Sequence, residues 1–305
     1  MLLCASLGVA QIAGTAGAFA RMGFGARGIG MSNALTAVST GEVSTYYNPA
    51  VASFSERRSA AATFSLLSFD RRLNFLSYTQ ALQPRGGISV GLINAGVTNI
   101  DGRDGDGVHT EDYSTFENKF YLAFSNRIEE RTSIGVAVKL YYSKLFEEVK
   151  STTVGFDIGA LVQVTDELSI GAVLKDINSK YQWDTKTVYN QEGKTTTDLI
   201  PNLRRIGVVY QLPSNSGVLS VEFENSSVRT NLIRFGAEYS IVENFTVRGG
   251  LDRWDFSDRA TGAKPSFGFT AKSRYNELSP AVNYAFVVEP FSPHGMHIIT
   301  LSVAF

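Results

Sequence analysis

The stretch Ile299-Thr300-Leu301-Ser302-Val303-Ala304-Phe305 at the end of the chain alternates apolar residues with small or polar ones. In a β-strand this alternation places the two sets of side chains on opposite faces. The same two-residue period recurs along most of the chain, in segments of about ten residues separated by turn-forming clusters. Strands can cross a membrane only in a closed sheet, whose outer face is apolar. The sequence therefore predicts an all-β, transmembrane antiparallel β-barrel in the bacterial outer membrane.

Composition agrees with this fold class and excludes others. The 28 Lys and Arg residues nearly cancel the 29 Asp and Glu residues, so charge gives no reason to expect a nucleic-acid partner. The chain of 305 residues has 28 Gly, 20 Phe and 13 Tyr, which suits many strands with small residues facing a crowded interior. Its mean hydropathy of −0.02 argues against a helical membrane protein, whereas polar residues facing a lumen explain it in a barrel.

About fourteen segments carry the strand pattern, which is within the even-numbered range of such barrels. In the segment 133–146, for example, Ile134, Val136 and Val138 alternate with Gly135 and Ala137. The predicted strands are 59–68, 72–82, 87–97, 116–127, 133–146, 150–164, 168–177, 203–212, 217–225, 230–241, 244–254, 264–273, 277–288 and 294–305.

Short and long connections alternate between these strands, and the long ones include Thr98–Thr115 and Asn178–Asn202. Outer-membrane barrels have short periplasmic turns and longer external loops, so both termini are expected in the periplasm. Trp183 and Trp254 fall near the external ends of strands, where we expect them to anchor the barrel at the membrane interface. We interpret the terminal Phe305 as the signal recognised by the barrel-assembly machinery.

The residues before the first strand divide into two parts. Residues 1–20 resemble a secretory signal peptide that is weak or truncated at its start, and A-x-A-like cleavage sites end at Ala18 and Ala20. Cys4 lies within this stretch; a lipoprotein site there is the less favoured reading, because only three residues precede it. Residues 21–56 do not fit the strand pattern and are rich in small residues. Because fourteen strands enclose more space than their side chains fill, we expect 21–56 to fold inward as a hatch or plug, with the barrel formed by 57–305.

Motifs for other chemistries are weak. Gly23–Gly28 matches G-x-G-x-x-G, but no βαβ unit surrounds it, so a tightly packed backbone explains it better than a nucleotide. Asp101, Asp104 and Asp106 do not match the register of a calcium loop, and we read them as a solvated acidic loop. The histidines do not form a zinc set, and no serine has the setting of a nucleophile. We expect no metal, no cofactor and no enzymatic activity.

Charged residues in the lumen phase of the strands have both signs, which favours ion pairs across the wall and to the hatch over a path for substrate. These residues are Lys139, Asp157, Lys175, Arg205, Arg234, Glu238, Arg248, Asp252 and Lys272.

Three runs in the hatch carry a family resemblance. They are Gly25-Ala26-Arg27-Gly28-Ile29-Gly30-Met31, Ala34-Leu35-Thr36-Ala37-Val38 and Tyr46-Tyr47-Asn48-Pro49-Ala50. Together they resemble the N-terminal signature of the PorV/PorQ family of FadL-like outer-membrane barrels.

The resemblance implies a fourteen-stranded barrel whose hatch carries a gating motif, here Asn48, Pro49 and Ala50, behind a glycine signature of Gly25, Ala26, Arg27, Gly28 and Gly30. Proline fixes its own φ and holds the preceding residue in extended geometry, so a rigid turn is expected there. The family usually continues this motif with Gly, whereas this chain has Val51.

Two functions follow from the resemblance. The first is an accessory role in type IX protein secretion, in which external loops contact secreted proteins or other secretion components. The alternative is a FadL-like passive channel for hydrophobic small molecules such as long-chain fatty acids. The mostly polar loops Thr98–Thr115 and Asn178–Asn202 favour the first, because a lipid channel should offer an apolar landing surface. A purely structural barrel is a third alternative. Outer-membrane lipid is a partner in every case.

Overall fold

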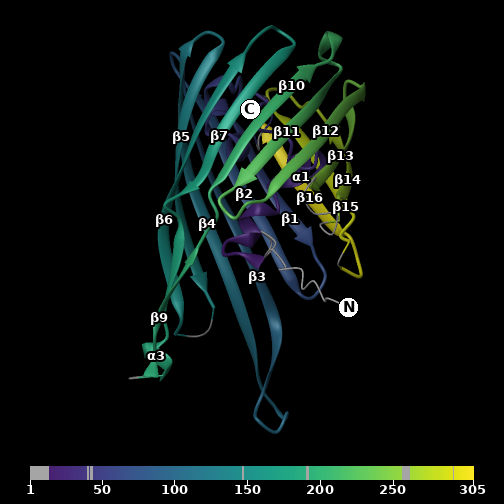
Figure 1. Ribbon diagram of the computed structural model, residues 1–305. Helices are drawn as coiled ribbons and strands as arrows, with labels where there is room; N and C mark the ends of the chain where they lie inside the picture. Colours follow the sequence, from purple (N-terminus) through teal and green to yellow (C-terminus); the bar gives the residue numbers. More distant parts are fainter. Residues whose placement is uncertain are drawn as a thin grey trace, which may run out of the picture.

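The computed structural model describes residues 14–39, 41, 44–145, 148–189, 192–255, 262–290 and 292–305. Fourteen of the described strands form one closed antiparallel barrel, in which β1 pairs with β16 (Figure 1). These strands are β1 (Ser59–Leu66), β2 (Arg71–Leu82), β3 (Gly86–Arg103), β4 (His109–Glu129), β5 (Thr132–Lys144), β6 (Lys150–Gln163), β7 (Leu168–Ile177), β10 (Leu203–Gln211), β11 (Gly217–Ser226), β12 (Asn231–Val242), β13 (Phe245–Asp255), β14 (Lys264–Lys272), β15 (Ser279–Val287) and β16 (Met296–Ala304).

The predicted fold class is confirmed, and each predicted strand overlaps one strand of the barrel. The alternation has the expected direction: on β6, Ile158 is 51% exposed on the outer face, whereas its neighbour Asp157 is 2% exposed and faces the lumen. On β16, Leu301 and the terminal Phe305 face outward while Thr300 is buried inside. The two-residue period therefore identifies the membrane-facing side of the wall.

The outer face of the barrel carries an apolar belt that runs around the wall. Because the sheet is closed, its backbone groups are paired and no edge faces the lipid. A closed barrel with such a belt is an outer-membrane architecture, which places the protein in the bacterial outer membrane. Outward side chains that form the belt include Leu76, Phe120, Leu122, Phe124, Val136, Val138, Leu140, Ile158, Ile170, Leu174, Ile206, Val208, Val221, Phe223, Phe235, Phe267, Val282 and Leu301.

The two long connections contain regular structure that the sequence pattern does not indicate. Strands β3 and β4 continue pairing past the wall as a two-stranded hairpin, through Ile100 opposite Tyr113 and Arg103 opposite His109, although β2 pairs with β3 only as far as Val97. The connection between β7 and β10 forms β8 (Lys180–Asp184), α3 (Lys186–Tyr189) and β9 (Thr195–Leu199), with β8 and β9 paired. Treating both segments as loops was wrong. The five-residue stretch Lys180–Asp184 alternates polar and aromatic residues, and its pairing stabilises the polar strand Thr195–Leu199, which shows no alternation of hydrophobicity.

Both hairpins lie at one end of the barrel, the lower end in Figure 1, which we call the loop end. The opposite end carries the short connections, including Gln83–Arg85 between β2 and β3, and we call it the turn end. β1 starts at the turn end and β16 finishes there, since Ser59 pairs with Ala304. No helix among the described residues is long and apolar enough to span a membrane.

Candidate functional site

The lumen contains the described part of the chain that precedes β1. Its elements are η2 (Ala18–Arg21), α1 (Gly25–Gly30), α2 (Ser44–Tyr47) and η3 (Pro49–Phe54). α1 contacts β13 to β16 and β1, whereas η3 contacts β2 to β6, so the segment bridges opposite sides of the wall. Residues 1–13, which hold Cys4 and most of the predicted signal peptide, lie outside the described residues. We keep the name hatch segment for residues 21–56.

Asn48 joins two parts of the hatch segment to the wall. It is fully buried and extended, with φ −147° and ψ 116°, as expected for a residue that precedes proline. Its Oδ1 accepts a hydrogen bond of 3.0 Å from the backbone N–H of Ala50, which caps η3. Its Nδ2 donates to the carbonyl of Thr36 at 2.8 Å and to the wall carbonyl of Ala160 at 3.0 Å. Val51, where the PorV/PorQ-type motif usually has Gly, packs as a buried residue of η3.

The predicted glycine signature forms α1, and its small residues allow close approach. A Cβ added at Gly28 would lie 2.6 Å from ring atoms of Tyr47, and one at Gly30 would lie 2.9 Å from Arg248. The N–H of Ala26 donates to the hydroxyl of Thr300 on β16 at 2.8 Å. Arg27 donates to both carboxylate oxygens of Glu238 on β12, at 3.0 and 3.1 Å.

Three pairs of wall glycines make room for the backbone of the hatch segment. Each pair consists of directly opposed residues on neighbouring strands: Gly135 with Gly159, Gly171 with Gly207, and Gly236 with Gly250. None of the six has a positive φ, so space and not backbone conformation explains the glycines. We call these six residues the glycine seat.

The hatch segment would collide with a side chain at most positions of the glycine seat. A Cβ at Gly135 would lie 2.5 Å from the backbone nitrogen of Ala50, and one at Gly171 would lie 2.9 Å from the Cα of Ala37. A Cβ at Gly236 would lie 2.7 Å from the carbonyl oxygen of Met31. The wall is thus fitted to three points of the hatch segment, around residues 31–32, 36–37 and 48–50.

Serine and threonine hydroxyls of the wall supply further hydrogen bonds to the hatch segment. Ser133 donates to the carbonyl of Ala50 at 2.8 Å, and its oxygen lies 2.8 Å from the hydroxyl of Ser53. At the far side of the lumen, the hydroxyls of Ser32 and Ser266 are 2.6 Å apart. These polar contacts act together with apolar packing, because Phe24 of the hatch segment lies in one buried cluster with Phe75 and Ile93 of the wall.

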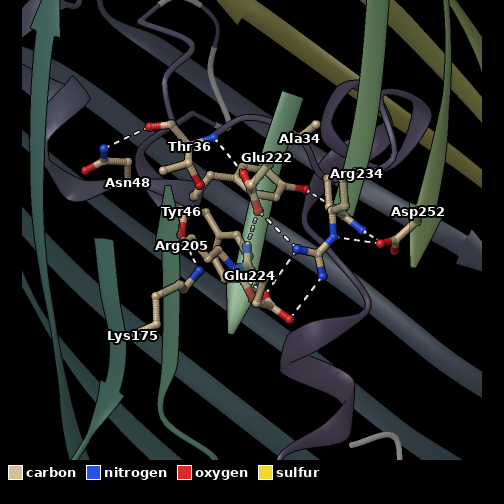
Figure 2. Close-up of polar contacts among 12 residues, drawn as sticks. Ala34, Thr36, Tyr46, Asn48, Lys175, Arg205, Glu222, Glu224, Arg234 and Asp252 are labelled. Carbon is tan, nitrogen blue, oxygen red and sulfur yellow. Dashed lines mark hydrogen bonds and ion pairs between the residues drawn. The ribbon is translucent and has the colours of Figure 1, made fainter. Parts of the chain in front are cut away.

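An ion-pair network on β10 to β13 extends this attachment (Figure 2). Arg234 donates to Asp252 at 2.6 Å and to Glu222 at 3.1 Å. Glu222 in turn accepts the N–H of Thr36 at 3.1 Å, and Asp252 accepts from Asn33 at 3.3 Å. The wall charges therefore pair with one another and also hold two points of the hatch segment.

Most of the charged residues expected in the lumen are buried there. The sequence pattern did not indicate five further charged residues in the lumen. Four of them form ion pairs, namely Arg27, Asp176, Glu222 and Glu224, and the fifth, Lys119, lies buried beside the ring of Tyr46. Lys139 pairs with Asp157 and Asp176, both almost fully buried. Lys272, in contrast, is exposed near the turn end.

Aromatic rings hold α2 on the opposite side of the lumen. The Tyr46 ring contacts two wall amines, with the Nζ of Lys119 at 4.7 Å and that of Lys175 at 4.3 Å from its centroid. Lys175 also donates to the carbonyl of Tyr46 at 2.9 Å, whereas Lys119 has no hydrogen-bond partner among the described residues. Cation–π contacts thus add to the attachment.

The β8–β9 hairpin covers the loop end of the lumen with apolar side chains. Tyr181, Trp183 and Ile200 are buried in the same cluster as Phe19, and the Tyr181 hydroxyl donates to Glu117 on β4 at 2.8 Å. The predicted interface role of Trp183 is therefore wrong, because its ring is only 8% exposed and its indole N–H donates to Asp198 at 2.8 Å. Trp254 does lie on the outer face, 47% exposed.

The turn end is hollow and polar. One cavity of about 500 Å³ is lined by Arg27 and Ser39 of the hatch segment and by Glu238 and Lys272 of the wall. A second cavity of about 420 Å³ lies beside Ser53 and Phe54. Both meet the side of the hatch segment that faces the turn end, so that side is already open to water.

The described residues contain no cluster of His, Cys, Asp and Glu that could hold a metal ion. In the acidic hairpin, Asp104 caps its own turn, with Oδ1 accepting from the N–H groups of Asp106 and Val108. Asp101 pairs with His109 at 2.7 Å and with Arg103, and the hydrogen bond to Asp101 raises the pKa of His109 above 6.5.

At the C-terminus, the N–H of Phe305 donates to the carbonyl of Arg58. The role of Phe305 in barrel assembly stays a prediction.

Comparison with known proteins identifies the fold. No protein family model and no curated protein sequence matches the chain. Among solved structures, the chain is similar to the Pseudomonas putida toluene transporter TodX, with a TM-score of 0.65 at 12% identity over 92% of this chain and 98% of that one. It is also similar to a Pseudomonas aeruginosa FadL homologue, with a TM-score of 0.63 at 12% identity over 93% of this chain and 98% of that one. The chain shares its fold with FadL-family outer-membrane barrels.

Proposed function

We propose that the protein is a passive, non-enzymatic outer-membrane channel for hydrophobic small molecules, with the hatch segment as its gate. The observation that carries the proposal is the glycine seat, which holds a chain segment across the lumen by fit and local polar contacts. Glycine at these positions lets the backbone of the hatch segment lie directly against the wall, and the apolar cluster that includes Phe24 and Phe75 adds to this contact.

The two ends of the lumen differ as such a channel requires. Apolar side chains of Tyr181, Trp183 and Ile200 gather at the loop end, where a hydrophobic molecule would enter. Polar cavities lie at the turn end, where release into the periplasm would occur. The similar fold of TodX, described as a toluene transporter, and of a FadL homologue supports the same substrate class.

Uptake into proteoliposomes tests the substrate class. Vesicles containing the protein are expected to take up a labelled monoaromatic hydrocarbon or long-chain fatty acid faster than empty vesicles, and to exclude a sugar of similar mass. The Asn48→Ala variant should raise the rate, because it removes three hydrogen bonds that hold the hatch segment. Uptake of the hydrophobic probe at the rate of empty vesicles in both proteins would refute the proposal.

We propose an accessory role in type IX protein secretion as the second candidate, in line with the PorV/PorQ resemblance. It is favoured by the β3–β4 hairpin, which extends beyond the wall and exposes an acidic surface with Asp101, Asp104, Asp106, Glu111 and Asp112. Replacing residues 100–113 by a two-residue Asn-Gly turn leaves the paired wall intact. Recovery of secreted proteins or secretion components by the intact protein, and not by this variant, in pull-downs from solubilised outer membranes would favour this role.

A further inference from the structure

The lipid-facing wall contains a groove that is separate from the lumen. It crosses β4, β5, β6, β7 and β10, has a volume of about 630 Å³, and is bordered by two rows of outward residues. In the first row, Phe124, Val136, Ile158, Leu174 and Arg204 lie side by side on successive strands. We call this depression the β4–β10 groove.

Two alanines create the groove. Ala160 on β6 and Ala172 on β7 are paired in the second row, where their neighbours Ile134 and Ile206 are larger. The small side chains lower the surface at the centre of the wall, and the flanking Ile158 and Leu174 form a ridge beside it, 51% and 46% exposed. The depression follows the hydrogen-bonding direction across five strands, a length of roughly 19 Å from four inter-strand spacings of about 4.8 Å.

The length fits one lipid chain. A single leaflet occupies about half of a hydrocarbon core that is about 30 Å thick, so a fully extended chain lying at an angle to the membrane normal needs somewhat more than about 15 Å. The groove therefore matches a chain of one leaflet.

A cation closes one end of the groove. Arg204 is the second residue of β10, at the loop end, and its exposed side chain lines the groove. One N–H of its guanidinium donates to the side-chain oxygen of Asn225 at 3.2 Å, and none of the ion pairs among the described residues includes Arg204. Asn225 and Asn231 continue its row on β11 and β12, which marks the boundary between the apolar belt and the polar surface. A guanidinium offers a planar set of donors that suits phosphate.

We propose that the β4–β10 groove binds an anionic membrane lipid, with one acyl chain over Ala160 and Ala172 and a headgroup phosphate on Arg204. The proposal is independent of the function of the lumen. A second groove on the wall supplies the contrast: it crosses β16 and β1 to β4, has a volume of about 530 Å³, and is lined by Ala60, Ala62 and larger apolar residues, with no charged residue among its lining. It should accept acyl chains without headgroup preference.

Native mass spectrometry of the purified barrel tests the proposal, after exchange into mild detergent with phosphatidylglycerol or phosphatidylcholine added. The wild-type protein should retain phosphatidylglycerol preferentially. Arg204→Gln should lower that retention about tenfold, because it removes a charge-assisted hydrogen bond to the phosphate, and should leave phosphatidylcholine unchanged. Arg204→Lys should keep most of the preference. Ala172→Phe, which fills the groove, should abolish the preference, whereas the matched Ala62→Phe in the second groove should not.

Heat-modifiable migration in SDS gels establishes that each variant remains a folded barrel. Equal phosphatidylglycerol retention by Arg204→Gln and the wild-type protein would overturn the proposal. So would an equal effect of Ala172→Phe and Ala62→Phe, or the appearance of a dimer that cross-links through this face in place of bound lipid. Uptake through the lumen is expected to be the same in all four variants.

Discussion

Replacing Gly135 by Ala probes the glycine seat most sharply, because the new Cβ would meet backbone atoms that cannot rotate away. It would lie 2.5 Å from both the nitrogen of Ala50 and the carbonyl carbon of Pro49. Ordinary contacts between carbon atoms are 3.5–4.0 Å, so the hatch segment would have to move by about 1 Å. Such a shift would stretch the hydrogen bond from Ser133 to Ala50, now 2.8 Å, beyond useful length.

The free-energy cost of Gly135→Ala applies only to the state in which the hatch segment lies against the glycine seat. Overpacking a close-packed site costs about 1–3 kcal/mol, whereas Ala in place of Gly in a strand is otherwise slightly stabilising. Since a factor of ten corresponds to about 1.4 kcal/mol, the population with an unseated hatch should rise by about 5- to 150-fold. The wall itself should remain as stable as before.

The assay combines uptake of a hydrophobic probe with the rate at which a maleimide labels Ser53→Cys, in a Cys4→Ser background. Both rates are expected to rise in Gly135→Ala. The matched control is Gly249→Ala on β13, where the added Cβ has its nearest neighbour at 3.4 Å. The reasoning is refuted if Gly135→Ala and Gly249→Ala give the same labelling and uptake rates.

Three further changes have defined outcomes. Asn48→Ala removes the side-chain donor from the carbonyls of Thr36 and Ala160, so labelling of Ser53→Cys should rise as expected for a loss of about 1–3 kcal/mol, and labelling at the wild-type rate would count against its role. Ile158→Arg places a charge on the lipid face and should cost about 2–4 kcal/mol in urea unfolding from vesicles if the site lies at the midplane; a neutral effect would contradict the assigned face. NMR titration of His109 should give a midpoint above 6.5 that falls in Asp101→Asn. Because the folded-state pKa is raised, the pair stabilises the hairpin below about pH 6.5 and loses this effect as pH rises through the folded-state value.

The strands could be predicted because one physical constraint acts on every residue of the wall. Side chains that face lipid must be apolar, as Val136 and Val138 are, so the two-residue period is visible without knowledge of pairing. The hairpin of β8 and β9 faces no lipid, and its Thr-rich strand Thr195–Leu199 shows no such period. Its existence depends on pairing with Lys180–Asp184, which the sequence pattern does not report.

The site was only partly predictable for the same reason. The motif Asn48-Pro49-Ala50 has a local physical meaning, and its geometry in the lumen agrees with it. The glycine seat has no such local signal in the sequence. Gly135 and Gly159 can be recognised as directly opposed residues only when the register between β5 and β6 is known. Individual glycines are visible in the lumen phase, but their shared contact with the hatch segment is a property of the closed barrel.

A reversible cross-link between hatch and wall tests the central claim, that movement of the hatch segment opens the lumen. Ser53 and Ser133 have hydroxyl oxygens 2.8 Å apart, so Ser53→Cys with Ser133→Cys in the Cys4→Ser background should form a disulfide. The control joins two wall positions, Ser240→Cys and Thr246→Cys, whose hydroxyls are 3.1 Å apart. Uptake of a hydrophobic probe should fall when the hatch cross-link is oxidised and recover on reduction, with no redox dependence in the control. Unchanged uptake through the oxidised hatch variant would show that the segment does not gate the barrel.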